Sequence, residues 1–137
     1  MAALFHDLGH LVADVPGVTD RPLHAPDDVH EARGARILAP IFGPSVAQPV
    51  ALHVTAKRWR CTREPSYYEQ LSLTSRDSLR AQGGLLSDEQ CARFESHPGF
   101  DDAVALRAWD DSAKDPSGAT DSLCDYQSLV DAVADAR

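Results

Sequence analysis

The chain has 137 residues, enough for one domain with a hydrophobic core, and we expect residues 1–137 to form a single domain. Hydrophobic residues make up 43% and charged residues 25%, the proportions of an ordinary globular protein. A formal net charge of −8 excludes a nucleic-acid-binding surface, which needs clustered basic residues, but leaves room for a small anionic substrate held by a few local cations.

The cysteines and the apolar segments indicate the cellular compartment in which we expect the protein. The N-terminal segment is apolar, but His6 and Asp7 interrupt it and no basic region precedes it, so it is not a signal peptide. No run approaches the roughly 18 apolar residues of a membrane span, and we expect no membrane partner. The three cysteines are widely spaced, support neither a disulfide framework nor a thiolate zinc site, and favour a reducing cytoplasm: Cys61, Cys91 and Cys124.

The apolar residues recur with helical spacing, and no strand-like alternation of useful length is present. Proline and glycine divide the pattern: Pro16-Gly17 end the first predicted helix, and Pro40 and Gly43-Pro44 end the second. A Ser-x-x-Gln capping box at Ser87 opens a later helix. The sequence predicts an all-α bundle of about six helices, at about 1–15, 29–38, 45–59, 67–82, 87–94 and 100–114, with an amphipathic helix in the tail at 120–137.

The segment from Leu4 to His10 has the sequence LFHDLGH and holds a compact set of metal donors. On a helix, His6 and His10 lie on one face about one turn apart, and Asp7 lies a step round it. Apolar residues on neighbouring faces, such as Leu8, would pin this polar cluster against a core. The pattern is typical of a metal site.

Further donors lie on other predicted helices. His30, His53 and Asp110 each fall on a separate one. With His6 and Asp7 they give three imidazoles and two carboxylates, a mixed set that suits iron, manganese or zinc. A carboxylate can bridge two metals with its two oxygens, so the set indicates a dinuclear site.

Cations accompany these donors. Lys57 lies one turn after His53, and its interpretation as a site residue or as a solvated lysine stays open at this point. Arg107 and Lys114 share a helical face with Asp110. For Arg107 and Lys114, a solvated stripe of salt bridges is the favoured interpretation.

The order of the motifs resembles one family. HDxGH is followed by an H-E pair, by AKRWRC, by LSLTSRDSLRAQGG and by LRAWDDSAK, over the stretch from His6 to Lys114. This order is similar to that of HD-domain proteins. More narrowly, it resembles the PhnZ-like phosphonate-degradation branch of the mixed-valent diiron oxygenases, which are related to inositol oxygenase. HD alone is common among phosphohydrolases, but the three later motifs are much more specific.

The resemblance implies an HD-domain helical bundle with two irons, Fe(II) and Fe(III), and with O2 as co-substrate. Members of the branch cleave the carbon-phosphorus bond of a 1-hydroxyphosphonate, such as 2-amino-1-hydroxyethylphosphonate, and give glycine and phosphate. The implied ligand set has a bridging carboxylate and two residues on each iron: Asp7 bridges, His6 and Asp110 bind one iron, and His30 and His53 bind the other.

The resemblance also implies substrate-binding residues. Lys57, Ser75 and Gln82 would hold the phosphonate, and His10 would assist near the substrate hydroxyl. The residue types fit, since a phosphonate dianion needs fixed charge and directed hydrogen bonds. Without the resemblance, a helix cap and an exposed amide are the favoured interpretations of the serine and the glutamine. His24 and His97 lie beside prolines, and we leave both out of the site.

The family pattern begins with a further histidine on an upstream helix, a ligand to the iron that His6 and Asp110 also bind. Only five residues precede His6 here. We therefore expect that iron to keep three protein ligands, and an apolar face of the bundle to be uncovered. An uncovered face predicts a poorly soluble, partly mobile or dimerised chain, so a homo-oligomer is one expected state.

Two alternative functions stay open. A metal-dependent HD phosphohydrolase of a nucleotide or another phosphomonoester would use a metal-bound water as nucleophile and would turn over without O2. A folded interaction module without catalysis would not bind iron. The sequence also leaves open which phosphonate is used.

Overall fold

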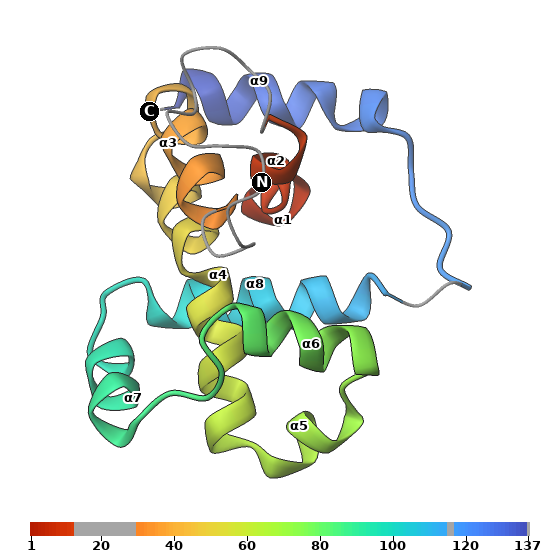
Figure 1. Cartoon of the computed structure of the whole chain (residues 1–137). Coiled ribbons are helices and arrows are strands. Elements are labelled where there is room, and N and C mark those ends of the chain that lie inside the picture. The colour runs from red at the N-terminus through yellow and green to blue at the C-terminus, as the bar shows by residue number, and fades with distance from the viewer. Residues whose placement is uncertain (13–29, 115–116, 137) are drawn as a thin grey trace.

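The structure is a computed structural model that describes residues 1–12, 30–114 and 117–136. Within these residues every regular element is a helix, which confirms the predicted all-α fold (Figure 1). The long helix α4 (Pro44–Arg63) has its most extensive contacts with α3 (His30–Phe42) and α8 (Phe100–Ser112). None of the described helices is long and apolar enough to cross a membrane.

A core of aliphatic and aromatic side chains joins α3 to α4. Leu38 and Phe42 from α3 and Val46 and Val50 from α4 are all buried in it. Full burial of such a side chain contributes about 1.5–3 kcal/mol to stability. The core therefore fixes α3 against the part of α4 that carries His53.

The C-terminal end of α3 differs from the prediction. The helix runs through Pro40 to Phe42, so the prediction that this proline ends it is wrong. An interior proline loses one backbone hydrogen bond, but burial of Phe42 in the core holds the last turn in place. The helix ends at Gly43, whose φ of 75° lies in the left-handed region and whose N–H donates to the Ala39 carbonyl over 3.0 Å.

The prediction of one continuous helix over 1–15 is also wrong. Up to residue 12 it consists of two short helices, α1 (Ala2–Phe5) and α2 (Leu8–Leu11), and the chain turns at His6 and Asp7 between them. Residues 13–15 lie outside the described residues. α2 approaches α3 so closely that Gly9 has no room for a side chain. The turn is thus explained by a tertiary contact, and no local stop signal in the sequence marks it.

The predicted helix over 67–82 is likewise two helices, α5 (Pro65–Gln70) and α6 (Leu73–Ala81). Leu71 between them is extended. Ser72 then caps α6 by accepting a hydrogen bond from the N–H of Ser75. The cap explains the interruption, because it requires an extended residue just before the first turn of α6.

The remaining helices complete the bundle. α7 (Asp88–Glu95) begins with the predicted capping box and packs Phe94 against the ring of Phe100, with 5.0 Å between the ring centroids. The tail holds the short 3-10 helix η1 (Leu123–Tyr126) and α9 (Gln127–Asp135), which packs beside the α3–α4 core. The tail prediction is therefore correct in its second half.

Candidate metal centre and anion cavity

The fold brings the five predicted metal donors together from four parts of the chain. His6 and Asp7 come from the turn between α1 and α2, His30 is the first residue of α3, His53 lies in the middle of α4, and Asp110 lies near the end of α8. Asp7 is at the centre of the group, because each of its carboxylate oxygens faces a different set of partners.

The two oxygens of Asp7 divide the donors. Oδ2 lies 3.4 Å from His6 Nε2, which in turn lies 3.5 Å from Asp110 Oδ1. Oδ1 lies 3.8 Å from His30 Nε2 and 3.8 Å from His53 Nε2. Those last two nitrogens are 3.2 Å apart. This is the division that a carboxylate bridging two metals needs.

The opposite ring nitrogens are held by the protein. His6 Nδ1 lies 2.9 Å from the Ala3 carbonyl, and His53 Nδ1 lies 2.7 Å from the Val50 carbonyl. A carbonyl only accepts, so Nδ1 carries a proton in both rings and Nε2 is left to bind a metal. His30 Nδ1 lies 3.4 Å from Glu31 Oε2, an ion-pair contact with a carboxylate and not a hydrogen bond to a carbonyl.

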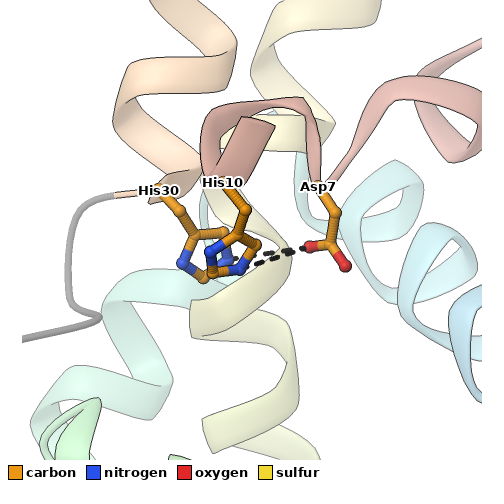
Figure 2. Close-up of side chains that lie close together, drawn as sticks. All are labelled: Asp7, His10 and His30. Atoms are coloured by element: carbon orange, nitrogen blue, oxygen red, sulfur yellow. Dashed lines mark ion pairs between the residues drawn. The ribbon is translucent and has the colours of Figure 1, made fainter. Parts of the chain in front are cut away.

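His10 adds a further nitrogen on the side of Asp7 Oδ1. Figure 2 shows His10 and His30 lying together opposite Asp7, and the ligand atoms of these three residues lie within 4.8 Å of one another. The His10 and His30 rings stack at a centroid distance of 4.0 Å. His10 Nε2 is 4.0 Å from Asp7 Oδ1, so His10 borders the centre and is exposed at its mouth.

The ionisable residues of the centre shift the pKa values of one another. Asp110 first, and then Asp7, raise the pKa of His6 to about 10 by hydrogen bonding. The hydrogen bond from His6 lowers the pKa of Asp7 to about 2. Burial lowers the pKa of His53 to about 4. Burial opposes ionisation of Asp110, but His6 and Arg107 outweigh it and hold the pKa of that carboxyl below its usual range.

A polar cavity of about 220 Å³ opens beside these donors. Lys57 is buried in its wall, with Nζ donating to Ser78 Oγ over 3.1 Å and to Gln82 Oε1 over 3.2 Å. Burial, and then the charge of Arg107, lower the pKa of Lys57. Residues from distant parts of the described chain line the cavity: Asp7, His10, His30, His53, Val54, Lys57, Thr74, Ser75, Ser78, Gln82, Arg107, Asp110 and Lys114.

The serines of α6 differ from the expectation in detail. Ser75 lines the cavity, but its hydroxyl accepts from Ser72 Oγ over 3.0 Å, and Ser78 is the serine that contacts Lys57. Sequence reasoning missed Ser78. The helical spacing could have found it, because Ser75, Ser78 and Gln82 at i, i+3 and i+7 share one face.

The two cations on and just after α8 differ in burial, and only one of them fits the predicted salt-bridge stripe. Arg107 is buried at 4% exposure, so its interpretation as part of a solvated stripe is wrong. The side chain of Lys114 is 53% exposed and forms ion pairs with Asp110 and Asp111, in agreement with the stripe. His97 lies away from the metal donors, beside a different cavity, and its Nδ1 accepts from the Gly99 N–H. His24 lies outside the described residues.

Comparisons with the sequences of known proteins identify a family, although no family model matches the chain. A hydroxymethylphosphonate dioxygenase from Gimesia maris is 42% identical over 130 residues, which cover 95% of this chain and 64% of that protein. A 1-hydroxy-2-(trimethylamino)ethylphosphonate dioxygenase (glycine-betaine-forming) from Leisingera caerulea is 32% identical over 135 residues, which cover 98% of this chain and 68% of that protein. The chain belongs to the PhnZ-like family of hydroxyphosphonate dioxygenases.

Membership of the PhnZ-like family confirms the resemblance found in the sequence motifs. The chain spans about two thirds of the length of these two relatives, 64% of one and 68% of the other. An uncharacterised protein of Acanthamoeba polyphaga mimivirus is also similar, at 33% identity over 138 residues. The assignment of individual residues to metals or substrate stays a prediction, supported by the distances given above.

Proposed function

We propose that this chain carries the metal centre and the substrate cavity of an iron- and O2-dependent enzyme that cleaves the carbon-phosphorus bond of a 1-hydroxyphosphonate. One observation carries the proposal: Asp7 directs one oxygen to each of two donor groups, and a cavity with a buried lysine adjoins both. The names of the two phosphonate dioxygenases support the substrate class and the use of O2. A homo-oligomer stays a prediction.

The donor set fits two irons. Asp7 would bridge them, His6 and Asp110 would bind one, and His30 and His53 would bind the other. Imidazole and carboxylate ligands suit iron, and the Nε2 atoms of His6 and His53 are kept available by the carbonyls behind them. When bound, the pair of irons would supply the redox chemistry with O2 and a positive charge that attracts the anionic substrate.

The chain's own residues then bind and orient the phosphonate. Lys57 supplies a positive charge at a site with only 6% exposure, where water screens it little. Ser78 and Gln82 hold its ammonium group in place, and Ser75 lies in the same wall. His10, exposed beside Asp7, would assist near the substrate hydroxyl.

The function is tested with the Fe(II)-loaded chain and two substrates, hydroxymethylphosphonate and 1-hydroxy-2-(trimethylamino)ethylphosphonate. We expect phosphate release from at least one of them in air and none under anaerobic conditions. Anaerobic phosphate release from a phosphomonoester would instead identify an HD phosphohydrolase.

Metal binding is expected to displace a proton from His6. Its raised pKa keeps the ring protonated at pH 8 in the metal-free chain, where a histidine of ordinary pKa is already neutral. The metal needs a neutral Nε2, so its affinity at this position should rise with pH until about pH 10. Titration with Zn(II) in a weakly buffered indicator solution at pH 8 should release about one more proton from the wild type than from His6→Ala. Equal release from the two chains would contradict this account.

Substitution of Lys57 is expected to weaken substrate binding. A charge-assisted hydrogen bond contributes about 1.5–3 kcal/mol, so Lys57→Met should raise KM by about 10- to 100-fold. Lys114→Met is the matched control, because Lys114 lines the same cavity but is half exposed and should change KM by less than about 3-fold. Steady-state kinetics of phosphate release measures both. Equal effects of the two substitutions would exclude a special role for the buried lysine.

A further inference from the structure

Arg107 is a buried arginine directly behind the candidate metal centre. Its side chain is 4% exposed, and each of its three guanidinium nitrogens faces a carboxylate. Nη1 lies 2.5 Å from Asp110 Oδ2. Nε donates to Asp111 Oδ2 over 3.1 Å, and Nη2 donates to Asp111 Oδ1. The arginine is thus committed to two neighbouring carboxylates of its own helix.

The guanidinium is itself held by residues from other helices. The Tyr67 hydroxyl accepts from Arg107 Nε over 3.0 Å and donates to Asp111 Oδ2 over 2.7 Å. Arg60 donates to the same Asp111 oxygen over 3.3 Å, and its guanidinium carbon lies 4.0 Å from the centre of the Tyr67 ring. Tyr67 of α5 and Asp111 of α8 therefore hold Arg107 directly, whereas Arg60 contacts these two residues and, among the contacts that the structure gives, not Arg107 itself.

This arrangement decides which oxygen of Asp110 faces the metal donors. Arg107 engages Oδ2, and the other oxygen, Oδ1, lies 3.5 Å from His6 Nε2. Without the arginine, Oδ2 would keep only its 3.6 Å ion pair with the half-exposed Lys114, and the Asp110 side chain would be oriented less firmly. A rigidly oriented ligand binds a metal more tightly than a freely rotating one, because less side-chain entropy is lost.

We propose that Arg107 is a positioning residue that holds Asp110 with Oδ1 toward the metal shared with His6. The inference rests on the proposed function, since it concerns one of the two proposed metal positions. Arg107 also lines the polar cavity. Its role there is nevertheless distinct from that of Lys57, because each of its three nitrogens faces a carboxylate of α8, whereas Lys57 donates to the neutral Ser78 and Gln82.

The test compares Arg107→Met with Arg60→Met. Both substitutions remove one positive charge from the same network, but among the contacts that the structure gives, Arg60 has none with Asp110. Metal content is measured after anaerobic loading with Fe(II), together with kcat, KM and the helical circular dichroism spectrum. We expect Arg107→Met to bind one of the two irons about 10- to 100-fold more weakly and to lower kcat, with KM changed little. Arg60→Met should retain both irons.

Three results separate the outcomes. Two tightly bound irons in both wild type and Arg107→Met would overturn the positioning role alone, whereas a wild type that binds no iron would overturn the proposed function. A raised KM with unchanged kcat would also overturn the positioning role, because it indicates direct contact with the phosphonate. If Arg107→Met does not fold, Tyr67→Phe, which removes one partner of the guanidinium, should still weaken that iron several-fold. Unchanged iron affinity in Tyr67→Phe would then count against the inference.

Discussion

Asp7→Asn is expected to abolish the two-metal centre and to lower the rate of phosphate release by more than about 100-fold. Loss of an outer partner of a metal ligand costs about 10- to 100-fold, and we propose that Asp7 binds both metals directly. The amide keeps the size of the carboxylate but loses its charge and one of its two ligating oxygens. Because the Asp7 side chain is 58% exposed, the fold should be retained. Metal analysis and phosphate release after Fe(II) loading measure the effect.

Asp102→Asn is the matched control, since Asp102 is an exposed aspartate in the first turn of α8. It should leave both the iron content and the rate within about 2-fold of the wild type. Two irons bound with full affinity in Asp7→Asn would contradict the bridging role.

Gly9→Ala is expected to destabilise the chain by about 3 kcal/mol or more and to lower Tm by roughly 10 °C. A Cβ at this position would lie 1.9 Å from the His30 carbonyl oxygen and 2.7 Å from its carbon. Both are backbone atoms, which cannot turn aside as a flexible side chain can. α2 and α3 must then separate, and Asp7 and His10 move away from His30 with them. Thermal unfolding and iron content measure the two consequences.

Gly34→Ala provides the comparison within the same contact. Its Cβ would lie 3.3 Å from Gly9 N and 3.5 Å from Val50 Cγ1, a tight fit that small shifts can relieve. The gain of about 1 kcal/mol in helix propensity offsets part of the crowding. The net change in stability should stay below about 1.5 kcal/mol. An equally large loss for both variants would show that overall crowding, and not the approach at Gly9, limits stability.

The sequence predicted which donors meet but not how each is presented. His30, His53 and Asp110 were expected on separate helices, and they lie on three separate helices. His6 and Asp7 were expected on a helix face, yet they lie in a turn. That turn depends on the approach of Gly9 to His30, a tertiary contact that local propensity does not encode.

The same reason explains the remaining differences. Arg107 resembles any surface arginine in an i, i+3, i+4 pattern with acidic residues, and its burial depends on Tyr67 from another helix. Helical spacing could have added Ser78 to Ser75 and Gln82, but the engagement of Ser75 by the Ser72 cap depends on where α6 begins. Pro40 predicts the end of a helix, but burial of Phe42 beyond it outweighs the local cost of the proline.

The proposed function requires a carboxylate that bridges two metals, so iron content is its most direct test. The chain is loaded anaerobically with Fe(II), freed of excess metal, analysed for iron and examined by EPR after brief exposure to oxygen. We predict two irons per chain and the signal of a coupled Fe(II)/Fe(III) pair. One iron, none, or two irons without magnetic coupling would contradict the assignment of Asp7 as a bridge.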